Sequence, residues 1–178
     1  DWVVANADQY SIRVINLSIG RSVATDYDFD IDIGCQAITR AKNAGILTVG
    51  AAGNASSDAP VPYRSMNDFD DCLSVIGLEA NTNYTSRRAA SNYNEPGISW
   101  NSVNATKDVC APGSDLIALS KSGGAESFQS GTSFASPIVA GIAAMCIAAE
   151  PSLTPDDVMQ LLESTTTDLG DAGWDRQT

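Results

Sequence analysis

The sequence predicts an α/β fold of three layers, α/β/α, in which helices cover both faces of a mostly parallel sheet. Two continuous apolar runs, 46–54 and 73–80, are typical of strands that are buried on both faces, as in parallel sheets. Helical patterns alternate with such runs along the chain, and this alternation favours a layered α/β architecture. The 178 residues, 43% of them hydrophobic, are enough for one domain with a core.

The remaining elements follow from short local patterns. In chain order they are a strand at 13–20, a helix at 35–45, strands at 108–113 and 115–120, a hairpin turn at 121–124 and a returning strand from 125. The helix at 35–45 carries apolar residues at helical spacing, and Gly45 is a residue that commonly ends helices.

Two helices are predicted near the end of the sequence. Residues 134–149 are apolar on every side, which is typical of a helix in a core. The last helix has a well-defined start, because Thr154 is a favoured N-cap and Pro155 is favoured at the first helical position. We expect it to bury one face, formed by Val158, Leu161 and Leu162.

Charge and hydropathy exclude two classes of partner. The net charge is −12, with 10 basic and 22 acidic residues, whereas binding to nucleic acid or to an anionic membrane needs clustered Lys and Arg. The longest apolar run, 138–149, is about a dozen residues and therefore too short to span a bilayer. The first ten residues lack the basic start and apolar core of a signal peptide. We expect no nucleic-acid or membrane partner.

Four cysteines leave the redox chemistry open. Cys35, Cys72, Cys110 and Cys146 allow three complete disulfide pairings, and the sequence does not choose among them. No pair has the CxxC spacing of a zinc site, so we expect no metal there. Buried thiols are the alternative to disulfides.

The stretch "SGTSFASPIVAGIAA", residues 130–144, carries the main chemical pattern. Ser133 is predicted at the start of an apolar helix, where unpaired N–H groups and the helix dipole stabilise developing negative charge. Such a serine suits acyl transfer. By composition alone, the stretch is also typical of a small-residue helix packed in a crowded core.

Residues 131–141, "GTSFASPIVAG", resemble the nucleophile signature of the subtilisin-like serine peptidases (subtilases), Gly-Thr-Ser-x-Ala-x-Pro-x-Val-Ala-Gly. The segment "AAGN" at 51–54 resembles the part of these enzymes that supplies the oxyanion-hole asparagine, which would be Asn54. "INLSIG" upstream and "CAPG" between the two motifs fit the same order. Ile138 stands where the family usually has a histidine, but that position is outside the catalytic triad.

The resemblance also implies a substrate-binding surface. It assigns one wall of the primary specificity pocket, which pairs with an extended polypeptide substrate, to Ser18, Ile19 and Gly20, and the other wall to Ala51, Ala52 and Gly53. With small residues on that wall, the pocket should admit a large apolar or aromatic P1 side chain. Main-chain pairing gives affinity and side-chain pockets give preference, so broad specificity is expected.

The sequence contains no histidine, although a serine nucleophile normally needs a base. In subtilases the triad aspartate and histidine precede the segment that resembles "INLSIG". We therefore expect residues 1–178 to be a partial peptidase domain, cut at both ends and inactive by itself. The acidic residues at 26, 28, 30 and 32 are expected at the surface, with calcium as the alternative. No cofactor is assigned, although calcium could bind to the complete protein, which the resemblance places outside the cell.

Three functions remain as alternatives. The chain is part of a secreted serine endopeptidase, a pseudopeptidase that binds peptides without cleaving them, or a structural fragment that assembles with another copy. In each case the strand at 13–20 would present an unpaired edge. The expected partner is therefore the N-terminal half of the domain or a second copy of the chain.

Overall fold

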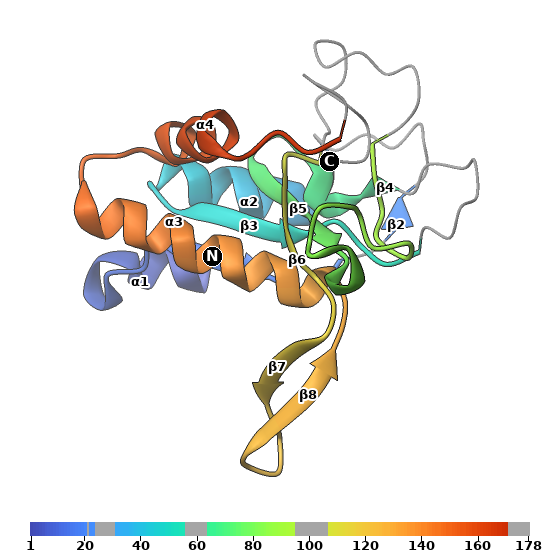
Figure 1. The fold of residues 1–178 in the computed structure, drawn as a ribbon. Coiled ribbons are helices and arrows are strands. Elements are labelled where there is room, and N and C mark those ends of the chain that lie inside the picture. The colour runs from blue at the N-terminus through green and yellow to red at the C-terminus, as the bar shows by residue number, and fades with distance from the viewer. Residues whose placement is uncertain (21, 24–30, 56–63, 95–106, 171–178) are drawn as a thin grey trace.

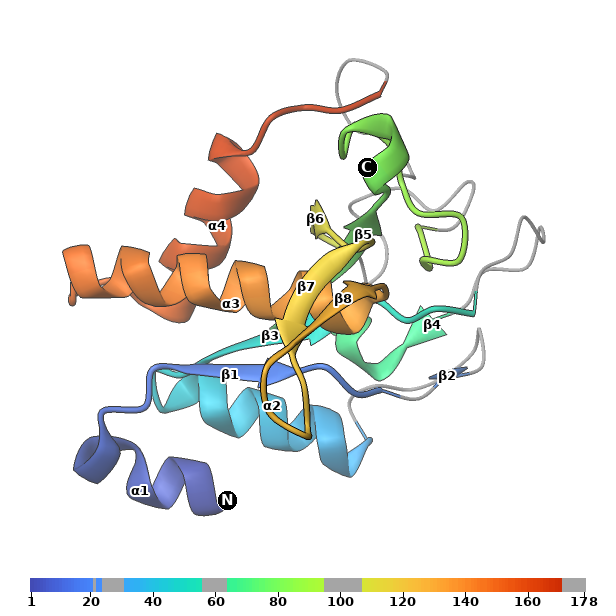
Figure 2. The same cartoon turned by 60° about the horizontal axis from the view of Figure 1, so that its bottom comes forward.

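The computed structural model describes residues 1–20, 22–23, 31–55, 64–94 and 107–170. In the described part of the chain, helices lie on both faces of a central sheet (Figures 1 and 2), and this three-layer arrangement confirms the predicted fold class. The acidic residues Asp26, Asp28 and Asp30 lie outside the described residues, as does the end of the chain from residue 171.

The central sheet has four strands, all parallel, in the order β1-β3-β5-β6. Their bounds are Val14–Leu17 (β1), Leu47–Ala51 (β3), Cys72–Leu78 (β5) and Val109–Pro112 (β6). Every residue of β3 and β5 is buried, as the continuous apolar runs predict.

Two core clusters fill the faces of this sheet. On one face lie α3 (Thr132–Ala149) and α4 (Pro155–Thr165), and Ala135, Val139 and Ala143 of α3 pack on the apolar side chains of β3 and β5. On the other face lies α2 (Ile33–Asn43), where Cys35 and Ile38 pack with Phe69 and Cys72. Figure 2 shows α3 and α2 on opposite sides of the strands, with α1 (Trp2–Tyr10) beside α2.

The other elements lie around the sheet. The predicted hairpin is formed by β7 (Leu116–Leu119) and β8 (Ala125–Gln129), which are antiparallel and project away from the sheet (Figure 1). A second antiparallel pair, which the sequence patterns did not indicate, joins β2 (Ser22–Val23) to β4 (Arg64–Ser65). Two short 3-10 helices, η1 (Met66–Asp68) and η2 (Ala80–Thr82), complete the described structure.

Five predicted strands end one to three residues earlier than expected, and the two largest differences are in β1 and β3. The predicted strand 13–20 stops at Leu17, and the strand 46–54 stops at Ala51. The last register pair between β1 and β3 is Leu17 with Gly50. Beyond it β1 and β3 no longer pair with each other, although Ala51 still pairs with β5, and residues 18–20 and 52–54 are available to form a site at the carboxyl edge of the sheet.

Helix α2 begins two residues earlier than predicted because Asp32 caps it. The Asp32 carboxylate accepts a hydrogen bond of 2.9 Å from the Cys35 N–H, a contact that satisfies one unpaired group of the first turn. The chain leaves the helix through Gly45, whose φ of +76° is the left-handed conformation that favours glycine.

Helix α3 begins at Thr132 and is 18 residues long, which is longer than the apolar run read from the sequence. By length and composition alone it could cross a membrane, with a mean hydropathy of 1.7. Core helices have the same properties. In this fold α3 contacts all four strands of the sheet.

Helix α4 starts at the predicted cap but buries a narrower face than predicted. Thr154 and Asp157 form a capping box, and Pro155 follows the cap. The expected burial of Leu161 is wrong, because this side chain is 37% exposed whereas Val158 and Leu162 are buried. Residues four apart lie over one another on a helix, so Val158 pairs with Leu162 against the core.

All four cysteines are thiols in the structure. Cys35 and Cys72 share one buried cluster, and burial raises the pKa of the Cys72 thiol, with the nearby negative charge of Asp108 adding to the effect. Among the described residues, no group of three acidic or cysteine side chains could hold a metal ion. Calcium in the complete protein stays a prediction.

Candidate active site

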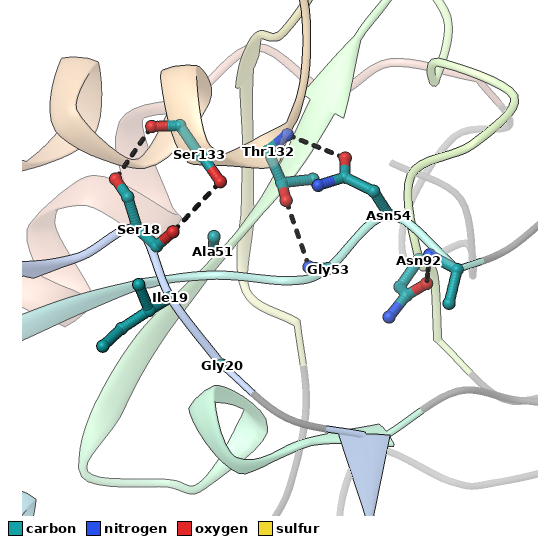
Figure 3. A pocket seen from close by; sticks show the side chains of 10 residues that line it. Ser18, Ile19, Gly20, Ala51, Gly53, Asn54, Asn92, Thr132 and Ser133 are labelled. Atoms are coloured by element: carbon teal, nitrogen blue, oxygen red, sulfur yellow. Dashed lines mark hydrogen bonds between the residues drawn. The ribbon is translucent and has the colours of Figure 1, made fainter.

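A pocket of about 340 Å³ lies at the carboxyl edge of β1 and β3, beside the first turn of α3 (Figure 3). This is where ligands commonly bind in open parallel sheets. Its lining residues are Ser18, Ile19, Gly20, Ala51, Gly53, Asn54, Ala55, Asn92, Thr132 and Ser133. Seven of the eight residues predicted from the sequence line this pocket. The eighth, Ala52, is fully buried behind it.

Ser133 lies in the first turn of α3, after the N-cap residue Gly131. Its hydroxyl donates a hydrogen bond of 3.0 Å to the Ser18 carbonyl oxygen, and the Ser18 hydroxyl donates one of 2.8 Å to the Ser133 carbonyl oxygen. The N–H groups of a first helical turn have no partner within the helix. Ser133 therefore combines a hydroxyl and a helix-terminal N–H at one wall of the pocket.

Asn54 is oriented by the residue that precedes the serine. The Asn54 amide oxygen accepts a hydrogen bond of 3.0 Å from the Thr132 N–H, and the Thr132 hydroxyl accepts one of 3.1 Å from the Gly53 N–H. Because the amide oxygen is bound in this way, the NH₂ group is the end of the side chain that can donate elsewhere. Figure 3 shows Thr132 between Ser133 and Asn54, with the Asn54 nitrogen on the side toward Ser133.

Asn92 holds the loop that carries Asn54. Its side chain donates to the Ala52 carbonyl oxygen at 2.8 Å and accepts from the Ala55 N–H at 3.0 Å, while its backbone N–H donates to the Gly53 carbonyl at 2.9 Å. Gly53 has a φ of +101°, and a Cβ atom there would lie 2.5 Å from the Asn92 side-chain nitrogen. Only glycine fits this close approach.

A second network joins α3 to the end of β1. The Ser136 hydroxyl donates to the Asn16 amide oxygen at 2.6 Å, and the Asn16 NH₂ group donates to the Ser18 hydroxyl at 2.9 Å. Ser18 is in turn hydrogen-bonded to Ser133, so Ser133 is fixed relative to β1. The sequence patterns did not single out Asn16, Asn92, Thr132 or Ser136. Thr132 and Ser136 lie within the motif at 131–141 and Asn16 lies within "INLSIG", whereas Asn92 belongs to no motif.

The arrangement can stabilise an oxyanion. The Ser133 N–H and the Asn54 NH₂ group are two donors of the type that binds a tetrahedral intermediate in acyl transfer. No ionisable side chain is among the residues that line the pocket in the described part of the chain. The sequence contains no histidine, the residue that most often serves as the base in such a reaction.

Comparison with known proteins agrees with these motifs and this geometry. Residues 2–178 match the model of the subtilase family. The chain belongs to the subtilase family. Subtilisin DY of Bacillus licheniformis is 35% identical over 170 residues, which cover 93% of this chain and 54% of that protein. Subtilisin-like protease 4 of Arthroderma gypseum is 35% identical over 166 residues, which cover 90% of this chain and 36% of that protein.

Solved structures agree with the fold of this subtilase. A cold-adapted subtilisin-like serine proteinase superposes with a TM-score of 0.70 at 28% identity, covering 99% of this chain and 57% of that one. Sphericase, at 24% identity and a TM-score of 0.75, supports the fold alone and is covered over 52% of its length. The chain thus spans about half the length, or less, of the relatives that it matches.

Proposed function

We propose that this chain is the nucleophile-bearing part of a serine endopeptidase. The observation that supports the proposal best is the shared pocket of Ser133 and Asn54, which Thr132 joins through its N–H group. The relatives carry names such as subtilisin and alkaline serine exoprotease, which fit a serine peptidase; cleavage inside the substrate chain is part of the proposal.

In the proposed reaction the Ser133 oxygen bonds to the carbonyl carbon of the scissile peptide, and its proton passes to a histidine supplied by another segment. The electron pair of the C=O bond moves to the carbonyl oxygen, where Asn54 and the Ser133 N–H stabilise it. The C–N bond then breaks, and the amine leaves with the proton from the histidine. Water, activated by the same base, hydrolyses the acyl-enzyme and returns the serine.

The proposed substrate is an extended polypeptide. Its backbone would pair with residues 18–20, which have left the sheet beyond Leu17 and are accessible at the pocket. Its P1 side chain would enter between this segment and Ala51 and Gly53, whose small size leaves room for an apolar or aromatic group.

The proposed partner is the N-terminal half of the domain, which would carry the triad aspartate and histidine. The alternative partner at the open β1 edge is a second copy of the chain. Secretion is proposed from the extracellular character expected of this family. A second function is favoured by one fact, the absence of histidine from the chain. By itself the chain would bind peptides in this pocket without cleaving them.

The test is labelling of Ser133 by a fluorophosphonate, which reacts with serines that have an active base. We expect the 178 residues alone to be unlabelled, because only the residual acceleration of about 10³- to 10⁴-fold from oxyanion binding remains without the triad. Addition of the N-terminal half should restore both labelling and peptide hydrolysis, and Ser133→Ala should abolish both.

Two results would contradict the proposal. One is rapid, stoichiometric labelling of the 178 residues without any partner. The other is a complete gene product that contains the upstream aspartate and histidine, folds, and still fails to label or to hydrolyse peptides.

A further inference from the structure

Asn67 lies behind the pocket and is completely buried, although neither the motifs nor the resemblance singled it out. It is the middle residue of η1, the short helix before β5. Its NH₂ group donates to the Ile19 carbonyl oxygen at 2.8 Å and to the Ala51 carbonyl oxygen at 3.0 Å. These two residues belong to the opposite walls of the pocket.

The bridge occurs where backbone pairing between the walls has ended. The register of β1 with β3 stops at Leu17 and Gly50, directly before Ser18 and Ala51. Past that point the segments must separate to leave room for a side chain between them. An asparagine amide has two N–H donors, so one side chain can hold a carbonyl group on each segment.

Two features fix Asn67 in this position. A Cβ atom on Gly50 would lie 2.6 Å from the Asn67 Cβ, so the absence of a side chain at Gly50 is what allows Asn67 to lie against β3. Next to it, the Asp68 carboxylate accepts bonds from the Ser74 hydroxyl at 2.9 Å and from the buried Lys107 ammonium at 2.6 Å. The helix η1 is therefore anchored to β5 and to Lys107, two residues before β6.

We infer that Asn67 is a specificity-determining positioning residue, which sets the distance between the Ile19 and Ala51 walls and thereby the preference for the P1 side chain. The inference rests on the proposed function, since it assigns the space between these walls to a substrate side chain. Ile19 is 75% exposed, and Asn67 holds its carbonyl group through the bond of 2.8 Å. Asn67 itself does not line the pocket and takes no part in bond making.

Substitutions at Asn67 should change preference more than overall binding. Asn67→Ala removes both donors, so the wall at residues 18–20 can move and the fit to a large P1 group is lost. Asn67→Asp keeps the shape but places carboxylate oxygens against two carbonyl oxygens, so it should have at least the same effect. Pairing of the substrate backbone with the protein is spread over several groups, so backbone binding should change less.

The chain offers a matched control in Asn94. Its side chain also makes two bonds to backbone, donating to the Lys107 carbonyl at 3.0 Å and accepting from the Lys107 N–H at 2.8 Å. It is partly buried and does not line the pocket. Asn94→Ala should lower stability without changing P1 preference.

The experiment measures peptide binding to the full-length protein that carries this chain, in a Ser133→Ala background so that peptides stay intact. Calorimetry gives the Kd of two tetrapeptides that differ only in P1, phenylalanine or alanine. We expect the unsubstituted pocket to prefer phenylalanine, and Asn67→Ala and Asn67→Asp to reduce the ratio of the two Kd values by about tenfold, while the Kd of the alanine peptide changes less than about threefold. Asn94→Ala should leave the ratio unchanged.

The inference is overturned if both Kd values rise equally in the Asn67 variants, if Asn94→Ala lowers the ratio as much, or if the unsubstituted pocket does not distinguish the peptides. Peptide hydrolysis by the protein with Ser133 intact is measured separately. If the P1 preference falls in the Asn67 variants but no hydrolysis occurs, the proposed function fails while the role of Asn67 stands.

Discussion

The two inner strands of the central sheet and its β1 edge differ sharply in how well they are covered. Strands β3 and β5 are buried at every residue, whereas β1 has none fully buried and pairs only with β3 among the described strands. The β7–β8 hairpin, which projects away from the sheet, exposes three large apolar side chains, Ile117 at 77%, Leu119 at 91% and Phe128 at 77%. Open strand edges and exposed apolar groups usually have a partner. The difference supports the proposal that another segment packs at β1.

The largest expected effect concerns this missing cover. Burial stabilises by about 25 cal/mol per Å² of apolar surface, so covering several hundred Å² is worth on the order of 10 kcal/mol. We expect the 178 residues alone to be oligomeric or to bind dyes that report exposed apolar surface, and the N-terminal half to raise the Tm. Light scattering and thermal unfolding measure both. A cooperatively unfolding monomer that binds no dye would show that the β1 edge needs no further segment to cover it.

Two ion pairs extend the comparison between buried and exposed parts of the molecule. Lys107 and Asp68 form a pair of 2.6 Å whose side chains are 4% and 1% exposed, while Arg40 and Asp1 form one of 2.9 Å at 46% and 82% exposure. Lys107→Met leaves a buried carboxylate without its cation and should lower the free energy of unfolding by about 3–5 kcal/mol. Arg40→Met should cost less than about 1 kcal/mol. Equal losses of unfolding free energy, measured by urea unfolding, would show that burial does not determine the cost of breaking these two ion pairs.

A leucine-to-alanine substitution can be made both in a buried strand and in the exposed hairpin, and the two costs in stability can be compared directly. Leu73 in β5 is fully buried, so Leu73→Ala should cost about 2–5 kcal/mol by leaving a cavity. Leu119 in β7 is almost fully exposed, so Leu119→Ala should change stability by less than about 0.5 kcal/mol in the 178 residues. In the presence of the N-terminal half, a clear cost at Leu119 would show that the hairpin is covered there.

A smaller loss than at Lys107 or Leu73 is expected at the cap of α4. Thr154→Ala removes the bond that the Thr154 hydroxyl accepts from the Asp157 N–H, at a cost of about 1 kcal/mol. In return, the Thr154 hydroxyl and N–H donate to the Asp157 carboxylate and lower its pKa. That contribution is present above the ordinary pKa of 3.8 and is lost as pH falls through the lowered value. Urea unfolding at neutral and acidic pH measures both, and an unchanged acid profile would contradict the assignment.

The sequence was sufficient to predict the buried parallel strands, the hairpin and the start of α4, because each depends on local patterns. It did not predict α1, which has no buried residue and a weak apolar pattern, or the β2–β4 pair, whose two-residue strands meet only through tertiary contacts. The burial of Leu161 was misjudged because a helical repeat does not define the width of the buried face.

The candidate site was predictable where a motif carried it. Ser133, Asn54 and the wall residues came from recognisable stretches, and seven of the eight predicted residues line one pocket. Asn67 and Asn92 were missed because no periodic pattern in the sequence indicates which asparagine will be buried. Its importance appears only when the fold brings the Ile19 and Ala51 carbonyls, 32 residues apart in the chain, to one amide group.

Stabilisation of the oxyanion of peptide hydrolysis by Asn54 and Ser133 together is tested by the kinetics of Asn54→Ala in the complete protein. We expect kcat to fall by about 10²- to 10³-fold, the cost of removing one such donor from a subtilisin, with little change in KM. A rise in KM at unchanged kcat would contradict it and make Asn54 a substrate-positioning residue or a structural turn.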